Sequence, residues 1–194
     1  MMEKLNRENL WSLEQYAEVR SEFRAEVMAH KRPRRVQIGP HATLYFEDFL
    51  TMKYQVQEML RAERIFEAAG INEEIDAYNP LIPDGSNLKA TFMIEYDDVT
   101  ERRAALAKLA GIEDTVWVQA EGGEKVYAIA NEDLDRSNED KTSAVHFLRF
   151  ELGPDTIGAF KQGRKIAFGI DHEGLAGSVT LTPEQTASLA ADLD

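Results

Sequence analysis

The chain has 194 residues, of which 43% are hydrophobic and 29% are charged, a composition typical of globular proteins and not of disordered or fibrous ones. Its formal net charge of −13 argues against a general nucleic-acid-binding protein, because contacts with phosphates need a cationic surface. The absence of cysteine excludes disulfides, thiolate zinc sites, cysteine-ligated iron–sulfur clusters and cysteine nucleophiles within the chain.

No apolar run is long enough to span a bilayer, and the amino-terminal residues lack the apolar core of a signal peptide. We therefore expect a cytoplasmic protein that does not enter the membrane. A chain of this length can form one sizeable core, so residues 1–194 are predicted to be a single compact domain. Within it, a mainly helical part (1–84) is predicted to precede a sheet-rich part (88–194).

The first predicted helix begins after the capping box Ser12-Leu-Glu-Gln15, and Trp11 is placed to pack on Tyr16. The apolar face of this helix also carries Arg20 and Arg24. One interpretation is that their stems cover apolar surface while the guanidinium groups reach water. The other is that one of them pairs with a buried carboxylate of another helix.

A basic cluster, His30-Lys-Arg-Pro-Arg-Arg35, follows this helix. Cations near a helix end complement the helix dipole and proline stops the helix, so a structural role explains the cluster. The alternative is an anion-sensing regulatory site built on Arg34 and Arg35. Such a site would bind a phosphate, a carboxylate or an acidic partner surface.

A short hairpin and an irregular loop are predicted on either side of the next helix. Val36–Ile38 and Thr43–Phe46 have the pattern of two strands around the turn Gly39-Pro-His41, whose histidine is expected to be solvated. The loop Tyr78–Gly85 contains two prolines and an Asp-Gly pair, which forbid regular structure. Its large apolar residues favour burial, so we expect the loop to press onto the body of the protein.

The helix between the hairpin and the loop is predicted to pack against the rest of the chain, with Asp48 as its cap, Ala69 as its last residue and Gly70 as its terminator. Its apolar stripe consists of Met52, Val56, Met59, Glu63 and Phe66. This register places Glu63 in the core, where an unpaired carboxylate is costly. We interpret Glu63 either as half of a structural ion pair with an arginine of the first helix or as a ligand-facing acid. The third alternative is a rotated helix that leaves Glu63 at the rim.

The second half alternates with period two and is predicted to contain six strands, over residues 91–96, 115–119, 125–129, 143–152, 165–170 and 178–181. Asp98-Val-Thr-Glu101 opens a further helix that ends at Gly111. The predicted fold class is α+β: a helical N-terminal part with a short hairpin, followed by a mainly antiparallel sheet with flanking helices. Residues 131–141 form a polar connector that is expected to be mobile.

The chain has no phosphate-binding glycine loop, no nucleophile elbow and no metalloprotease or EF-hand motif. His146 shares a strand face with Leu148 and Phe150, which predicts a hydrogen-bonded core histidine. A metal-dependent enzyme is the alternative, and the residues that could bind its metal are Glu58, Glu63 and His146. The residues that could hold a small anionic substrate beside that metal are Arg20, Arg24 and Arg61.

Four stretches carry a resemblance to a known family: Arg34-Arg-Val-Gln-Ile-Gly-Pro40, Gln57-Glu-Met-Leu-Arg61 with Glu63, Tyr78-Asn-Pro80 and Ala90-Thr-Phe-Met-Ile-Glu-Tyr96. They resemble a bacterial family of domains of unknown function of about this length. Members of that family are often encoded beside rubrerythrin-like proteins and iron–sulfur oxidoreductases, which implies a protein partner in a redox or peroxide-response system. We therefore favour a non-enzymatic accessory or binding protein without a cofactor, and leave its oligomeric state open.

Overall fold

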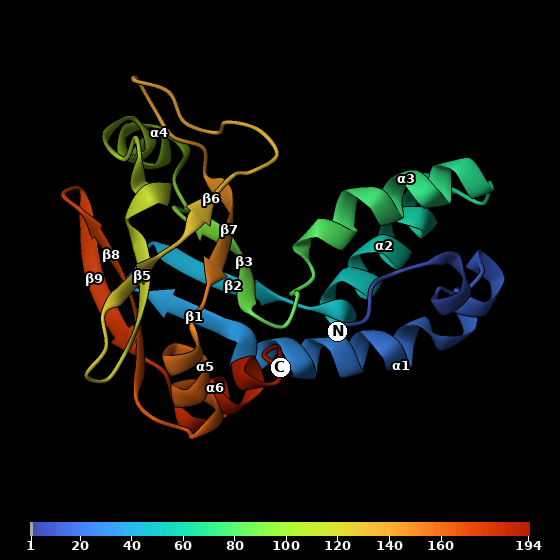
Figure 1. Cartoon of the computed structure of the whole chain (residues 1–194). Coiled ribbons are helices and arrows are strands. Elements are labelled where there is room, and N and C mark those ends of the chain that lie inside the picture. The colour runs from blue at the N-terminus through green and yellow to red at the C-terminus, as the bar shows by residue number, and fades with distance from the viewer. Residues whose placement is uncertain (1) are drawn as a thin grey trace.

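The computed structural model describes residues 2–194, which form six α-helices and two antiparallel sheets, so the predicted α+β class is confirmed. The strands gather into one body, and α1, α2 and α3 extend from it as a helical arm (Figure 1). We call these parts the sheet body and the helical arm. Within the described residues, no helix is both long and apolar enough to cross a membrane.

The helices are α1 (Leu13–Lys31), α2 (Phe49–Glu63), α3 (Ala68–Tyr78), α4 (Val99–Lys108), α5 (Pro154–Lys161) and α6 (Pro183–Ala190). The short 3₁₀ helices are η1 (Arg7–Asn9), η2 (Arg32–Arg34), η3 (Asn79–Leu81) and η4 (Ile112–Thr115). The strands are β1 (Arg35–Ile38), β2 (Ala42–Glu47), β3 (Asn87–Ile94), β4 (Val116–Ala120), β5 (Lys125–Tyr127), β6 (Ile129–Ala130), β7 (Val145–Glu151), β8 (Ile166–His172) and β9 (Leu175–Thr180).

The strands form a five-stranded sheet of order β1-β2-β3-β7-β6 and a four-stranded sheet of order β5-β4-β8-β9, where one sheet was predicted. The chain passes from the second sheet to the first at Ala128, the single residue between β5 and β6. The hairpin β1–β2 is present as predicted, and β2 pairs with β3. The predicted helical part (1–84) therefore contributes two strands to the same sheet as the predicted sheet-rich part.

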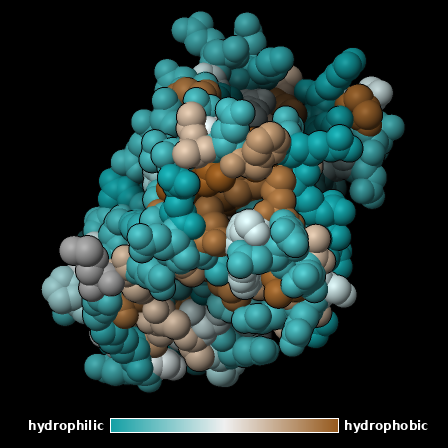
Figure 2. Space-filling view, turned by 90° about the vertical axis from the view of Figure 1, so that its right-hand side faces the viewer, coloured by the Kyte–Doolittle hydropathy of each residue, from teal (hydrophilic) through white to brown (hydrophobic). Residues whose placement is uncertain are grey.

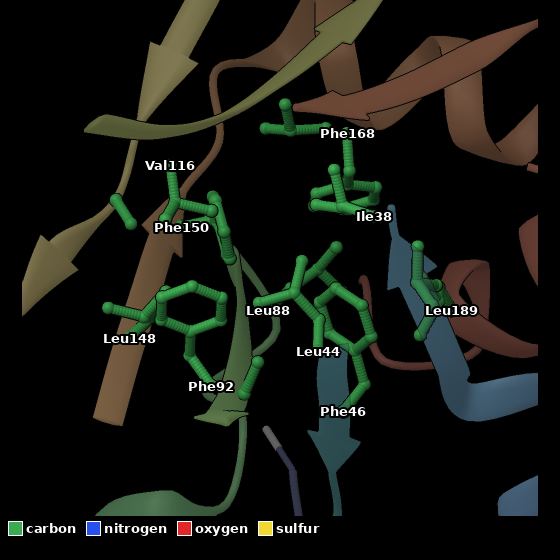
Figure 3. Close-up of a cluster of buried hydrophobic side chains, with 14 of the residues drawn as sticks. Ile38, Leu44, Phe46, Leu88, Phe92, Val116, Leu148, Phe150, Phe168 and Leu189 are labelled. Carbon is green, nitrogen blue, oxygen red and sulfur yellow. The ribbon is translucent and has the colours of Figure 1, made fainter. Parts of the chain in front are cut away.

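The main core lies between the two sheets (Figure 3). Alternation along β7 turns His146, Leu148 and Phe150 inward, because successive strand residues point to opposite faces. The ring of Phe168, from the other sheet, lies 5.3 Å from that of Phe150 and 5.1 Å from that of Phe46, centroid to centroid. The five-stranded sheet thus has an inner face in the core and an outer face toward the helical arm.

The helical arm has its own apolar clusters, and α1 and α2 begin where the sequence predicts, whereas α3 begins within the range predicted for α2. Ser12 and Asp48 cap α1 and α2 through reciprocal capping boxes, and Trp11 stacks on Tyr16. The predicted end of α2 is wrong. Arg64 adopts a left-handed conformation with φ of 54°, which stops the helix at Glu63, so Gly70 lies inside α3 and terminates nothing.

Of the other local predictions, the strand ranges hold with small changes, whereas the loop predicted to lack regular structure contains the 3₁₀ helix η3. Each of the six predicted strand ranges overlaps a strand, and the third one is divided into β5 and β6. In the loop before β3, Ile82 is 1% exposed, as expected of a loop pressed onto the body. His41 lies at the hairpin turn but stacks on Tyr96 at 3.8 Å between ring centroids, so it is less solvated than predicted.

Candidate ligand-binding cleft

Glu63, the predicted buried acid, is exposed at the last residue of α2, and this prediction is wrong. The buried stripe of α2 continues from Val56 to Leu60 and not through Met59. Position 63 therefore does not lie on the side of the helix that faces the core. Within the described part of the chain, Glu63 makes no ion pair. Phe66, the last member of the predicted stripe, is 74% exposed beyond the end of the helix.

Arg20 does meet a carboxylate of α2, but the partner is Glu58. The Arg20 Nε and Nη2 atoms donate to Glu58 Oε2 and Oε1 at 2.9 and 2.8 Å, and Tyr16 Oη donates to the same carboxylate at 2.8 Å. The hydrogen bond from Arg20 lowers the pKa of Glu58 to about 2, although burial works in the opposite direction. Because all three residues are engaged with one another, the group fastens α1 to α2 and leaves no free acid.

The other candidate arginines are placed apart from one another. Arg24 and Arg61 are exposed on α1 and α2. Arg34 is 2% exposed, and its guanidinium lies within the protein. Arg35, which follows it, is exposed and lies over the ring of Tyr45 at 5.9 Å. The two guanidinium groups are therefore not brought together at one site, because Arg34, the last residue of η2, is buried and Arg35, the first residue of β1, is exposed.

His146 is fully buried and hydrogen-bonded, as predicted. Asn131 Oδ1 accepts from the Phe147 backbone N–H at 3.0 Å, which fixes the amide so that Asn131 Nδ2 donates to His146 Nδ1 at 2.8 Å. His146 Nε2 therefore carries the proton and faces the Ser143 carbonyl oxygen at 2.9 Å. In this tautomer His146 cannot accept a proton from the Thr142 hydroxyl 2.8 Å away, so the contact is structural.

The three residues of the predicted metal site are not brought together. Glu58 is bound to Arg20 in the helical arm, Glu63 is exposed at the end of α2, and His146 lies in the core of the sheet body. Among residues 2–194, no group of three or more histidine or carboxylate side chains has the arrangement of a metal site.

Burial of His146 gives a testable pH dependence. Burial lowers its pKa below the ordinary value of 6.5, although Glu113 opposes this shift. The unfolded chain then binds more protons than the folded one below pH 6.5, so His146 stabilises the fold fully above that pH and progressively less as the pH falls. Replacement by glutamine is expected to cost about 1 to 3 kcal/mol at pH 7.5 through lost hydrogen bonds.

The measurement is the free energy of unfolding of both proteins in urea at pH 7.5, 6.0 and 5.0. The difference between wild type and His146→Gln is expected to shrink with falling pH, and titrating groups that do not act on His146 cancel in that difference. Glu113, Asp114 and Arg136 are the charged groups that act on His146. A difference that grows toward pH 5 would mean that the attraction of Glu113 and Asp114 outweighs burial.

The described residues do form a cleft, at the junction of the helical arm and the outer face of the five-stranded sheet. Its volume is about 320 Å³, and its lining is mostly apolar. The lining residues are Ala77, Tyr78, Pro80, Leu81, Lys89, Glu132, Asp133, Phe147, Leu148 and Arg149. Figure 2 shows that the molecule is hollowed on the side of the helical arm, with apolar surface in the hollow and hydrophilic residues around it.

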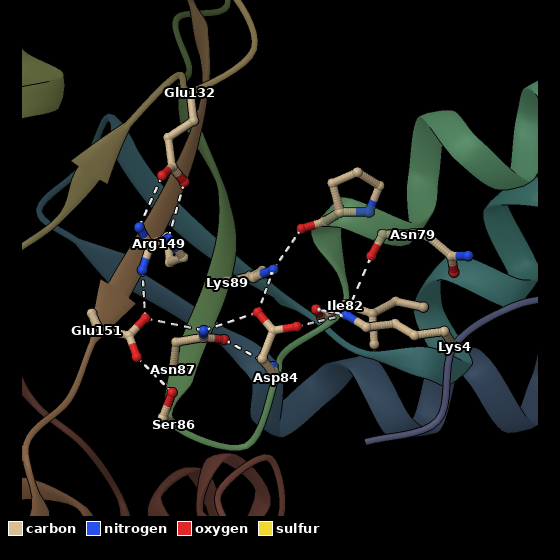
Figure 4. A network of polar contacts seen from close by, with 11 residues as sticks. Lys4, Asn79, Ile82, Asp84, Ser86, Asn87, Lys89, Glu132, Arg149 and Glu151 are labelled. Atoms are coloured by element: carbon tan, nitrogen blue, oxygen red, sulfur yellow. Dashed lines mark hydrogen bonds and ion pairs between the residues drawn. The ribbon is translucent and has the colours of Figure 1, made fainter. Parts of the chain in front are cut away.

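Lys89 and Arg149 stand next to each other on the sheet wall of the cleft, since they are direct partners in the pairing of β3 with β7. Lys89 Nζ donates to the Pro80 carbonyl oxygen at 2.7 Å and pairs with Asp84 at 3.0 Å (Figure 4). Asp84 also pairs with Lys4 at 3.0 Å. The segment between η3 and β3 is thus held to both the sheet and the amino-terminal segment, which fixes the width of the cleft.

These interactions leave Asp84 ionised. Burial raises its pKa, but hydrogen bonds from Asn87, Lys4 and Lys89 outweigh burial and hold the pKa below the usual range. On the other side, Glu132 binds Arg149, and that hydrogen bond lowers the pKa of Glu132. Each cation of the sheet wall is therefore matched by an ionised acid.

Sequence reasoning did not single out this cleft. The alternation along residues 145–151 does place Phe147 and Arg149 opposite His146, on the outer face, and the structure confirms that orientation. What the alternation could not show is that η3 lies over this face and turns it into one wall of a cleft, because that contact joins residues far apart in the chain.

Comparisons with known proteins agree with the fold and assign no activity. A family profile described as "Protein of unknown function (DUF3501)" matches residues 4–193. The chain is also similar to a crystal structure described as a novel protein of unknown function from Burkholderia pseudomallei K96243, with 52% sequence identity and a TM-score of 0.93. That match covers 99% of this chain and 100% of the other. No curated protein matches the chain.

Proposed function

The chain belongs to the DUF3501 family of proteins of unknown function, and we propose that it is a non-enzymatic binding protein that holds a small ligand in the cleft between the helical arm and the sheet body. The observation that carries the proposal is the cleft itself, with its apolar lining and two cations on one wall. Its volume of about 320 Å³ lies at the lower end of the range of about 300 to 1,000 Å³ for small-molecule sites.

The chemistry of the lining favours binding over catalysis. The two acids of the lining are each engaged by an arginine, Glu132 by Arg149 and Asp133 by Arg136. Lys89 is engaged by Asp84 and a carbonyl oxygen, so its amino group is not free to act as a nucleophile. The lining therefore offers apolar surface, charge and shape complementarity, and it offers no nucleophile paired with a base.

The proposal predicts that the protein binds 8-anilinonaphthalene-1-sulfonate, a probe with aromatic rings and one anionic group. We expect saturable, single-site fluorescence enhancement by the native protein. Ala77→Trp is expected to abolish it, because Ala77 lines the cleft, is exposed and loses no contact when enlarged. Ala69→Trp is the matched control, since Ala69 is exposed on the same helix and outside the cleft.

Fluorescence titrations of the three proteins, together with their thermal unfolding midpoints, make the test. Equal enhancement by Ala77→Trp and wild type would place the bound probe elsewhere and refute the proposed site. Unchanged unfolding midpoints are needed from both variants, because partly unfolded chains also bind this probe.

Two earlier expectations stay predictions. A role beside a rubrerythrin or iron–sulfur oxidoreductase system rests on the family resemblance alone, and a cytoplasmic location rests on the sequence alone. The rival interpretation as a metal-dependent enzyme is not favoured by any observation, since Glu58, Glu63 and His146 occupy three separate places.

A further inference from the structure

Arg149 holds two carboxylates of different character (Figure 4). Its Nε and Nη2 atoms donate to Glu132 Oε2 and Oε1 at 3.0 and 2.9 Å, so the guanidinium binds that carboxylate in a bidentate manner. Its Nη1 atom donates to Glu151. The Nε and Nη2 atoms are on the cleft side of the guanidinium, because Glu132 is itself one of the lining residues.

Glu151 is fixed in place, whereas the carboxylate of Glu132 can be displaced from Arg149. Besides Arg149, Glu151 accepts hydrogen bonds from the Ser86 hydroxyl and the Asn87 amide. Within the described residues, Arg149 is the only hydrogen-bond partner of the Glu132 carboxylate, whose side chain is 53% exposed. Glu132 also lies on the polar connector, next to the anchored residue Asn131. Its carboxylate can therefore leave Arg149 for water while the backbone stays attached at position 131.

Apolar side chains lie beside the Nε and Nη2 atoms of Arg149. Phe147 lies two residues earlier on the same face of β7, with the Arg136 guanidinium 4.7 Å from its ring centroid on one side. Tyr78 of α3 and Leu81 of η3 also line the cleft. A molecule that put a carboxylate on Arg149 would thus lay its remaining atoms against aromatic and aliphatic side chains. A planar group suits this space, because aromatic rings stack well on such surfaces.

From these contacts we infer that the ligand of the cleft is a carboxylate with a flat apolar body, and that Glu132 occupies the place its carboxylate takes. This inference rests on the proposed function and names the ligand class for the same site. Glu132 acts as an internal competitor, so the apparent affinity is reduced by the fraction of molecules in which Glu132 holds Arg149. It also neutralises Arg149 when no ligand competes.

The test compares naphthalene-1-carboxylate with naphthalene-1-carboxamide, which has the same rings and no charge. Binding to wild type is measured by isothermal titration calorimetry. We expect the carboxylate to bind more tightly than the amide. Glu132→Gln is expected to tighten carboxylate binding about three- to fivefold, the effect of removing a partly exposed ion pair, and to leave amide binding unchanged.

Two further variants separate the site from general charge effects. Glu139→Gln removes the same charge from the same connector, and Glu139 is exposed with no ion pair among the described residues, so affinity is expected to stay unchanged. Arg149→Lys keeps the positive charge but cannot form the bidentate pair of hydrogen bonds. It is therefore expected to weaken carboxylate binding and to leave amide binding unchanged. Thermal unfolding midpoints check that each variant is folded.

The outcomes distinguish this inference from the proposal it rests on. If neither compound binds, the proposed function and the inference both fail. If both bind equally and Glu132→Gln changes neither affinity, the cleft is a binding site but the carboxylate class is wrong. Tighter carboxylate binding by Glu139→Gln as well would show that net charge, and not the position of Glu132, controls affinity.

Discussion

Replacing Arg34 by methionine is expected to destabilise the protein by about 3 to 5 kcal/mol, the cost of removing one partner of a buried ion pair. Arg34 Nη2 pairs with Asp192 at 2.5 Å, and the guanidinium also lies 3.6 Å from Asp48. The backbone carbonyl oxygens that accept from the Arg34 guanidinium are those of Phe46, Glu47 and Ser188. Arg34 therefore joins the start of β1, the end of β2, the cap of α2 and the C-terminal segment.

The loss is large because the partners stay buried when Arg34 is removed. Asp192 is 4% exposed and would be left buried without a counterion, next to Asp48. Burial already raises the pKa of Asp192 to about 6, with Arg34 opposing the rise. Without Arg34 that pKa rises further, so Asp192 binds a proton that the unfolded chain has lost. The variant is then expected to lose more stability at pH 8 than at pH 5.

Chemical denaturation of Arg34→Met and Arg35→Met measures this effect with a built-in control. Arg35 is the next residue, carries the same side chain and is exposed, so its replacement is expected to cost less than about 1 kcal/mol. A small loss for Arg34→Met, with loss of anion binding instead, would restore the anion-sensing interpretation of this cluster.

Replacing Gly169 by alanine is expected to destabilise the protein by about 1 to 3 kcal/mol, the usual cost of forcing an extra carbon atom into a close-packed contact. Gly169 of β8 is paired with Trp117 of β4, whose indole ring lies across the glycine. A Cβ atom at position 169 would lie 2.1 Å from Trp117 Cζ2, well inside van der Waals contact. Gly169 is thus required by the close approach of the ring and not by its backbone conformation.

The ring cannot easily move aside. Trp117 Nε1 donates to Asp171 at 3.0 Å, and the ammonium group of Lys125 lies 4.3 Å from the ring centroid on the exposed side. Displacing the indole would break the hydrogen bond and the cation–π contact together. The strain therefore falls on the pairing of β4 with β8 in the middle of the four-stranded sheet.

Gly177→Ala is the matched control, because a Cβ atom there meets only Ile38 at 3.8 Å, an ordinary contact. We expect this variant to be as stable as wild type or slightly more stable, since alanine restricts the unfolded chain. A double-mutant cycle with Trp117→Val completes the test. The loss caused by Gly169→Ala should shrink when the ring is absent, and a loss that is independent of Trp117 would refute the steric explanation.

The sequence predicted most local structure because its signals come from neighbouring residues. The capping box at Ser12 and the cap residue Asp48 marked the starts of α1 and α2, and alternation marked the strands, including the inward position of His146. The error at Glu63 has a similarly local origin. A helix turns by about 100° per residue, so extending a stripe through Met59 instead of Leu60 changed which side chain was thought to be buried.

Which residues meet across the fold was decided by the tertiary structure alone. The sequence showed that Arg20 was suited to a carboxylate, and the packing of α1 on α2 selected Glu58 and left Glu63 in solvent. Likewise, alternation placed Arg149 on an outer face, and the position of η3 made that face one wall of a cleft. Capping and periodicity depend on residues within a few positions of one another, whereas ion pairs and clefts depend on how whole helices and strands pack.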